Sequence, residues 1–246
     1  MPDRSRRPRS DQMRNRDALV TAAGELMVEH GIDVPLDVVA KRAGLGNATL
    51  YRHFPERRDL ISAVLVRNLQ RNELALAQGL ASQSAWAGLT GYLTWLFAEQ
   101  MDNPAYMSAL RAVPSGTNAE VDRLRNRALG ALEGLICRAK DEGEMRGDRW
   151  LEDVFLFLAL NEHLTHAGHR DPRVASQRLL ELALESLASP HPGRPGATQE
   201  PGTVLALRRS LGQELAGLPV ADADPHTAEK HNFHGRSGAQ DTPTRS

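Results

Sequence analysis

The stretch NATLYRHF, residues 47–54, gathers side chains that can hydrogen-bond to base edges and phosphates. An Asn amide can bond an adenine edge at two points, and the methyl groups of Ala and Thr can contact thymine. Tyr, Arg and His side chains can reach phosphates or bases. If the stretch is helical, Leu50 and Phe54 lie one turn apart on a buried edge. The residues that point away from that edge or flank it are Asn47, Ala48, Thr49, Tyr51, Arg52 and His53.

The elements before this stretch supply the support that such a helix needs. Residues 36–43 have a helical period with Val39 and Ala40 inward, and Gly44 and Gly46 bracket a tight turn. Two short helices joined by a glycine turn are typical of a helix-turn-helix, in which the first helix braces the second in a DNA groove. The spacing alone is equally compatible with a solvent-facing helix of a bundle that carries ordinary polar residues.

A longer string resembles one known family. The sequence TAAGELMVEHGIDVPLDVVAKRAGLGNATLYRHFPERRDLISAVL is similar, without gaps from about Ala18 to Leu65, to the N-terminal DNA-binding domain of the TetR family of bacterial transcriptional regulators. The resemblance implies which positions read bases: Asn47, Ala48, Thr49 and Tyr51. It also implies which positions hold phosphates: Thr49, Arg52, His53 and Arg57. Arg57 begins the next predicted helix, where free backbone N–H groups favour a phosphate.

The sequence departs from the family pattern at two places. Residues 35–37, Pro-Leu-Asp, stand where Ser or Thr with a polar neighbour is usual, and Asp37 would repel a phosphate. Residues 46–48, Gly-Asn-Ala, replace the commoner Ser-Lys-Gly-like opening of the recognition helix, which removes a cation. Residues 1–16 hold six Arg against two Asp. This segment is either a solvated disordered tail or an arm that follows DNA phosphates and compensates for the missing cation.

The rest of the chain has helical periodicity, and no segment alternates with period two. Predicted helices cover residues 15–31, 36–43, 47–54, 56–80, 84–101, 103–113, 117–143, 151–168 and 172–188. The fold class is therefore all-α, with an N-terminal three-helix helix-turn-helix domain. The resemblance makes the following helical bundle a ligand-binding and dimerisation domain. We expect a disordered basic arm over 1–13, the DNA-binding domain over 14–60, the bundle over 61–188, and a mostly disordered Pro- and Gly-rich tail over 189–246 with one isolated helix near 203–217.

The resemblance implies a small-molecule pocket between the middle helices. The apolar candidates for its lining are Trp95, Met101, Tyr106, Met107 and Phe155. The polar candidates are Arg111, Asn161 and His163, because polar groups on apolar helices need partners. Ordinary core packing is the competing interpretation of the apolar residues, and Arg111 could simply face solvent.

A histidine series raises the separate question of a metal site. His163, His166 and His169 are spaced by three, but on a helix the third lies about 120° from the first. A polar helix end is the simpler interpretation, and we expect no metal and no cofactor.

The last two predicted helices supply an apolar stripe. By the resemblance they pair across a two-fold axis as a four-helix interface between two copies of the chain. The predicted contact residues are Phe157, Leu164, Leu179, Leu180, Ala183, Leu184 and Leu187. Two recognition helices related in this way require a palindromic operator whose half-sites lie about 34–36 Å apart, or a multiple of one turn.

Composition narrows the class of protein further. The chain has 246 residues, 41% hydrophobic, which suffices for one or two domains with a core. The single cysteine, Cys137, cannot form an internal disulfide, which fits a reducing cytoplasm. No apolar run approaches the ~20 residues of a membrane span. We therefore expect a cytoplasmic protein with no membrane partner.

The resemblance as a whole implies a ligand-responsive transcriptional regulator. A repressor that binds double-stranded DNA at a palindromic operator as a homodimer, and that a small-molecule effector releases, is the expected form. Two other classes stay open. A helical hydrolase could use the histidine series and Glu162 around a metal, but no nucleophile motif, phosphate-binding loop or complete ligand set is present, so we expect no catalytic residue. An architectural DNA binder could use the Arg-rich arm alone, but it would not need the long bundle.

Overall fold

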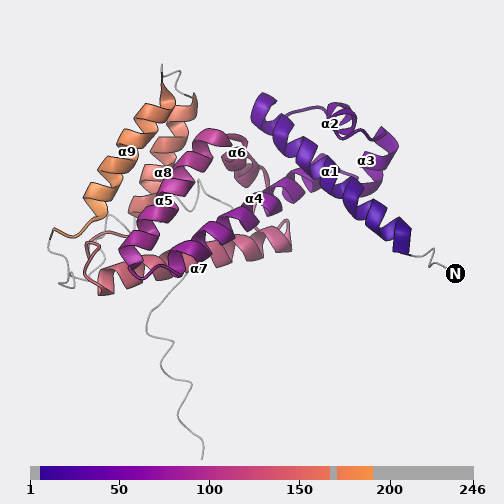
Figure 1. Cartoon of the computed structure of the whole chain (residues 1–246). Helices are drawn as coiled ribbons and strands as arrows, with labels where there is room; N and C mark the ends of the chain where they lie inside the picture. The colour runs from indigo at the N-terminus through magenta and orange to yellow at the C-terminus, as the bar shows by residue number, and fades with distance from the viewer. Residues whose placement is uncertain (1–5, 167–170, 191–246) are drawn as a thin grey trace, which may run out of the picture.

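The computed structural model describes residues 6–166 and 171–190, and within these ranges the chain forms nine α-helices and no strand. The all-α class that the sequence predicts is therefore confirmed. The helices form two lobes, a small one at the N-terminus and a larger bundle (Figure 1). None of the described helices is long and apolar enough to cross a membrane.

The smaller lobe is built by α1 (Arg6–His30), α2 (Leu36–Arg42) and α3 (Asn47–His53). Gly31 ends α1 at φ 83° and Gly44 ends α2 at φ 68°, a left-handed conformation that residues with a Cβ rarely adopt. Apolar side chains from all three helices meet in one core. Its fully buried members include Leu19, Ala23, Leu26, Val39, Ala40 and Leu50.

Helix α1 begins at Arg6, inside the segment 1–13 for which we expected a disordered arm. Arg, Gln and Met favour helix, and Pro8 falls in the first turn, where its missing N–H costs no hydrogen bond. The side chains of residues 10–14 are exposed, so the basic segment leaves the lobe as a helix. The remainder of the expected arm, residues 1–5, and almost all of the expected tail, residues 191–246, lie outside the described residues.

Helix α4 (Arg57–Leu80) belongs to both lobes. Leu60 and Leu65 are fully buried in the core of the smaller lobe, and Leu76 is buried in the core of the bundle. The expected domain boundary between residues 60 and 61 therefore falls inside a continuous helix. A single element connects the two cores.

The larger lobe packs five more helices with α4: α5 (Ala85–Asp102), α6 (Ala105–Ala112), α7 (Ala119–Asp141), α8 (Leu151–His166) and α9 (Pro172–Leu187). Helix α4 packs against α5, α6 and α7, while α8 and α9 pack against each other and against α5. Side chains of Ser84, Asn118 and Asp171 cap α5, α7 and α9 by accepting from backbone N–H groups. The N–H of Arg146, shortly before α8, donates to the carbonyl of Leu187 at 2.9 Å, so α8 and α9 run antiparallel.

Two glycines let α4 and α5 approach closely. A Cβ placed on Gly88 would lie 2.2 Å from the carbonyl oxygen of Gly79, and a Cβ on Gly79 would lie 3.0 Å from the carbonyl oxygen of Gly88. Both neighbours are backbone atoms, which cannot rotate away. The absence of a side chain at Gly88 is therefore a condition for this crossing.

Candidate nucleic-acid interface and ligand cavity

Helix α3 presents a polar outer face on an apolar base. Leu50 and Phe54 are 0% and 2% exposed, as the helical period predicts, and Tyr51 on the outer side is 52% exposed. Among the other predicted contact residues of α3, Asn47, Ala48 and Arg52 are exposed, and Thr49 and His53 are half-buried. The base holds the helix in place and the outer side chains are available to a partner.

The turn before α3 and a cation beside it fix its orientation. Gly44 in the left-handed region lets the N–H of Leu45 donate to the carbonyl of Ala40 at 2.9 Å, which closes α2. The guanidinium of Arg16, from α1, lies over the ring of Phe54 at 5.2 Å from its centroid. The recognition stretch is thus attached to both other helices of the lobe.

The basic side chains of α2 and α3 differ in their partners. Nη2 of Arg42 donates to Oε2 of Glu29 on α1 at 2.9 Å, and this bond lowers the pKa of Glu29. Lys41 and Arg52 form no hydrogen bond or ion pair with any residue that the structure describes. Arg42 therefore braces α2 against α1, while the charges of Lys41 and Arg52 are free to meet a phosphate.

Arg57 begins α4, where a capping box occupies two of the backbone donors. The side chain of Glu56 accepts from the N–H of Asp59, and Oδ2 of Asp59 accepts from the N–H of Glu56 at 3.0 Å, which forms a capping box. Nη2 of Arg57 donates to the carbonyl of Ile32 at 2.7 Å. The capping box occupies the N–H groups of Glu56 and Asp59, but it leaves the N–H groups of Arg57 and Arg58 without a hydrogen-bond partner among the described residues. A phosphate contact here can use these two N–H groups as well as the guanidinium.

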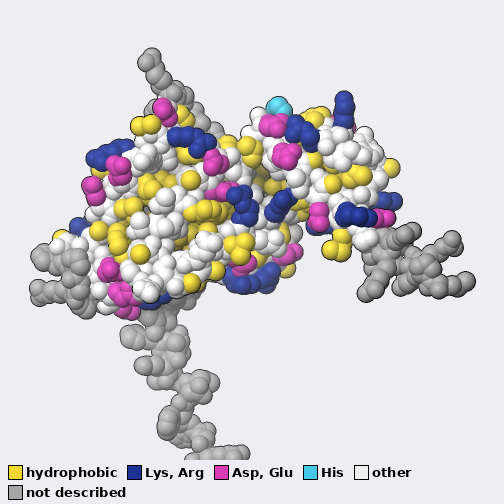
Figure 2. All heavy atoms as spheres, in the orientation of Figure 1, with side chains coloured by type: hydrophobic (Ala, Val, Ile, Leu, Met, Phe, Trp, Pro, Cys, Tyr) yellow, Lys and Arg dark blue, Asp and Glu magenta, His cyan; other side chains and the backbone are white. Residues whose placement is uncertain are grey.

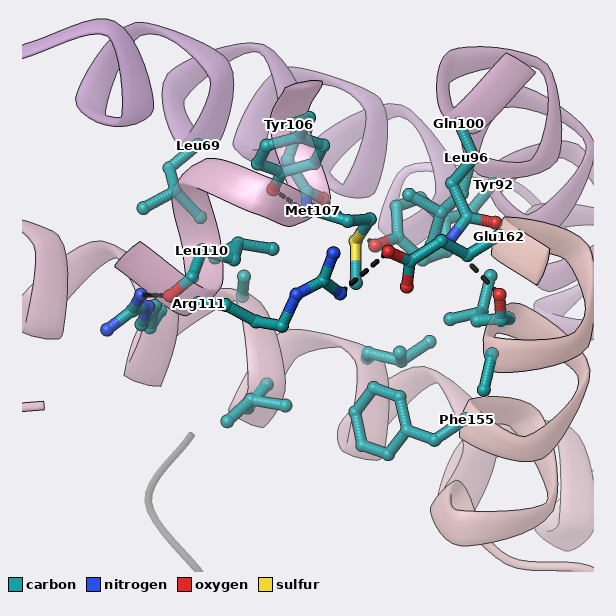
Figure 3. A pocket seen from close by; sticks show the side chains of 17 residues that line it. Leu69, Tyr92, Leu96, Gln100, Tyr106, Met107, Leu110, Arg111, Phe155 and Glu162 are labelled. Atoms are coloured by element: carbon teal, nitrogen blue, oxygen red, sulfur yellow. Dashed lines mark hydrogen bonds and ion pairs between the residues drawn. The ribbon is translucent and has the colours of Figure 1, made fainter. Parts of the chain in front are cut away.

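A cavity of about 270 Å³ lies inside the bundle, between α4, α5, α6, α7 and α8 (Figure 3). Its wall is mostly aliphatic and aromatic, with Leu69, Leu96, Met107, Leu132, Phe155 and Leu158 among its members. Small-molecule sites of proteins usually enclose about 300–1,000 Å³ and have mainly apolar walls with a few placed polar groups. The cavity is therefore suited to a compact, largely apolar molecule.

Buried hydrogen bonds connect α4, α5 and α6 at the wall of this cavity. Oη of Tyr92 donates to Oδ1 of Asn72 at 2.9 Å, and Nδ2 of Asn72 donates to Oη of Tyr106 at 3.3 Å. Burial raises the pKa of Tyr106 to about 12 and also raises that of Tyr92. Both phenols are therefore neutral at physiological pH. A molecule that touches this wall touches α4, the helix that continues into the smaller lobe.

An ion pair joins α6 to α8 at the cavity. Nη1 of Arg111 lies 2.6 Å from Oε1 of Glu162, and Figure 3 shows the Arg111 side chain reaching across to that carboxylate. Arg111 is 49% exposed and Glu162 is 16% exposed. The pair thus lies between the interior and the surface, and each charge neutralises the other.

Comparisons with known proteins agree with this geometry. The family described as bacterial regulatory proteins, tetR family, matches residues 19–64, which run from α1 into α4. An HTH-type transcriptional regulator of Mycobacterium tuberculosis is 25% identical over 186 residues, 72% of this chain and 77% of that protein. A TetR transcriptional regulator of Streptomyces coelicolor is 29% identical, with a TM-score of 0.52 over 72% of this chain and 99% of that structure. The N-terminal lobe is a TetR-family DNA-binding domain.

A TetR-family regulator of Agrobacterium tumefaciens shares the fold at 16% identity. The TM-score is 0.60, and the alignment covers 72% of this chain and 100% of that structure. The likeness therefore extends beyond the helix-turn-helix and includes the bundle. The bundle is the lobe that contains the cavity.

Four of the eight suggested pocket residues line the cavity: Tyr106, Met107, Arg111 and Phe155. The other four, Trp95, Met101, Asn161 and His163, do not. The ring of Trp95 stacks on Tyr92 at 6.1 Å between centroids, and Met101 is half-buried elsewhere. Asn161 is 0% exposed and donates to Oε1 of Gln100 at 2.8 Å, while His163 is exposed. Each lies on a lining helix, but on another side of it.

Four charged or amide residues of the wall were absent from these eight: Asn72, Gln100, Arg125 and Glu162. A signal for Asn72 was present, because it lies between Leu69 and Leu76 at the spacing of one buried helical face. A polar residue at such a position is either paired inside the protein or placed for a ligand.

Among the described residues, no group of three or more His, Cys, Asp or Glu could hold a metal ion. His163 is exposed. The side chains of His166 and His169 lie outside the described part of the chain.

The stripe suggested for the dimer faces the chain's own interior. Ala183 and Leu187 are 1% and 0% exposed. Phe157, Leu179, Leu180 and Leu184 pack against the core of the bundle, and Leu164 is half-buried. Other apolar side chains of α8 and α9 are exposed instead: Leu156 at 40%, Leu160 at 54%, Val174 at 62% and Leu182 at 43%. Both helices carry apolar residues on two sides, and the period alone cannot tell which side is internal.

Proposed function

We propose that this TetR-family chain is a ligand-responsive repressor that binds a palindromic operator as a homodimer and leaves it when a small molecule occupies the bundle. The observation that carries the proposal is the position of α4. Leu60 and Leu65 of this helix are buried in the same core as Leu50 of α3, while Leu69 and Asn72 line the cavity. A change in the cavity wall can thus reach the recognition surface through α4 alone.

In this proposal the outer face of α3 lies in the major groove. Asn47, Ala48, Thr49 and Tyr51 contact bases, and Thr49, Arg52, His53 and Arg57 contact phosphates. Two observations support these roles: Tyr51 is 52% exposed, and the charge of Arg52 has no partner within residues 6–166 and 171–190. The phosphate contacts set the position on the duplex, and the base contacts select its sequence.

The second copy packs on the outer face of α8 and α9. Leu156 and Leu182 lie equally many residues from the connection between these antiparallel helices, so their exposed side chains are at the same height along the helix pair. Leu160 and Val174 extend the apolar surface towards that connection. An exposed apolar surface of this kind on a helical pair marks a protein interface. Figure 2 shows that hydrophobic side chains gather on the bundle lobe in that view, while charged residues of both signs are scattered over both lobes.

The effector acts by population shift. It binds a geometry of the bundle in which α4 is tilted, so that the two recognition helices no longer match half-sites about 34–36 Å apart. To change the ratio of the DNA-competent state to the tilted state from 99:1 to 1:99, the ligand has to bind the tilted state more favourably by about 5.5 kcal/mol.

The first experiment is a selection of bound sequences from random DNA with the purified full-length protein. A short palindrome is the expected result. Diffuse binding without a palindrome would favour an architectural DNA binder, and the absence of any binding would contradict the assigned recognition surface.

The dimer surface is tested separately by sedimentation. Leu160→Glu should convert the dimer to a monomer, because a carboxylate cannot be buried without a partner. Leu74→Glu, at a 66% exposed leucine of α4, is the matched control and should remain dimeric. A dimeric L160E protein would place the interface elsewhere.

A further inference from the structure

The cavity wall contains a buried cation whose hydrogen-bonding capacity is only partly used. Arg125 of α7 is 1% exposed, and its Nη2 donates to the carbonyl of Leu110 on α6 at 2.6 Å. Its Nε and Nη1 have no hydrogen-bond partner among the residues that the structure describes. The nearest carboxylate, Oδ1 of Asp122, lies 3.8 Å from Nη1, beyond hydrogen-bond distance. A guanidinium stays protonated in proteins, so this charge persists without full compensation.

The other charged and amide groups of the wall are already paired with the protein. Asn72 is bonded to both buried tyrosines. Nε2 of Gln100 donates to the carbonyl of Leu158 at 3.2 Å, and its Oε1 accepts from Asn161. The Arg111 guanidinium is neutralised by Glu162 at 2.6 Å (Figure 3). Arg125 is therefore the charged group of the described wall that has donors left to offer.

We propose that the effector is a small organic carboxylate, whose anionic group pairs with Arg125 and whose apolar body fills the cavity along Leu132, Phe155 and Leu158. The regulatory meaning of this pairing rests on the function proposed above, but the binding itself does not. A cationic molecule is disfavoured by Arg125, and a neutral one leaves Nε and Nη1 without an acceptor. The carboxylate of Glu162 repels a second carboxylate, so the ligand enters with its anionic end towards Arg125.

Binding of a carboxylate at Arg125 should also move one particular helix, α6. Nε and Nη1 of Arg125 are fully buried, so a carboxylate reaches them only if the adjoining wall moves. That wall includes α6, because Leu110 of this short helix accepts the existing bond from Arg125. Helix α6 also packs against α4. Binding of a carboxylate to Nε and Nη1 would therefore displace α6 and alter its packing on α4.

The test measures binding to the DNA-free full-length protein by isothermal titration calorimetry. Two carboxylates, octanoate and phenylpropionate, are each compared with the alcohol and the amine of the same skeleton. Because a hydrogen bond to a charged group is worth more than a neutral one, the better carboxylate should bind about tenfold or more tightly than its alcohol. Equal or stronger binding of the alcohols or the amines would overturn the proposal, and so would the failure of all six probes to bind.

Variants assign the preference to Arg125. Arg125→Met fills the same space without charge, so the preference for the carboxylate over the alcohol should fall to within about threefold. Arg123→Met, at a 52% exposed arginine of the same helix, is the matched control and should keep the full preference. A preference that persists in R125M would show that another group binds the carboxylate. The melting temperature separates the roles, since a purely structural Arg125 predicts a large loss of stability with no change in the ratio.

A second variant protects the test if R125M does not fold. Ala128→Leu leaves Arg125 in place and fills part of the cavity, so binding of every probe should weaken by at least tenfold. Unchanged binding in A128L would place the probes outside the cavity and contradict the proposal. The selection of bound DNA is an independent test. If the protein binds carboxylates but selects no palindrome, only the proposed function is contradicted. If it selects a palindrome but shows no preference for carboxylates, only this inference is contradicted.

Discussion

The three tyrosines of the chain divide between the two lobes, and they are used in opposite ways. Tyr51 on the outer face of α3 is 52% exposed, whereas Tyr92 and Tyr106 in the bundle are 4% and 2% exposed. The phenol of Tyr51 is available to an external partner. The phenols of Tyr92 and Tyr106 instead hydrogen-bond to Asn72 and join three helices around the cavity. The smaller lobe therefore exposes its tyrosine phenol on the surface, whereas the bundle uses its two phenols for buried hydrogen bonds.

The largest expected effect is a loss of stability caused by a substitution in the bundle. Gly88→Ala should lower the free energy of unfolding by about 3 kcal/mol or more, because the new Cβ meets backbone atoms of Gly79 that cannot rotate away. Gly91→Ala on the same helix is the matched control. Apart from the backbone of its own helix and its two chain neighbours, no atom lies within 4 Å of its Cβ position, so the change should stabilise the protein by up to about 1 kcal/mol. Urea denaturation followed by circular dichroism measures both, and similar stabilities would contradict the close crossing of α4 and α5.

The next effect concerns the smaller lobe and should leave stability untouched. Tyr51→Ala should weaken binding to the selected operator by about tenfold to a hundredfold, the value of a good base contact, with the melting temperature unchanged. Leu74→Ala removes another exposed large side chain, from α4, and should bind the operator normally. Fluorescence anisotropy with labelled operator measures both. Wild-type affinity in Y51A would remove α3 as the recognition helix, and a large loss of stability would mean that Tyr51 supports the fold.

The same contrast explains how much the sequence could predict. The buried edge of α3 follows from the spacing of Leu50 and Phe54, and the string around it is long enough to indicate the family. The bundle offered only periodicity, which places residues on a helix but does not say which helix faces which. Asn161 was therefore assigned to the cavity although it bonds to Gln100, and Ala183 was assigned to the dimer although it is buried in its own chain. Arg125 was overlooked because the sequence does not show that a charged residue of α7 is buried and donates to the Leu110 carbonyl of α6.

The smallest effect tests the buried phenols by pH. An ordinary tyrosine ionises near pH 10, whereas burial raises the pKa of Tyr106 to about 12. Between these values the unfolded chain loses a proton that the folded chain keeps, so the unfolded state binds fewer protons and stability falls as pH rises. Each such tyrosine contributes about 1.4 kcal/mol per pH unit to this fall, and Tyr106→Phe should make the slope shallower by that amount. An equal slope in Y106F and wild type would show that the Tyr106 phenol ionises freely in the folded protein, and the two lobes would no longer differ in how they use tyrosine.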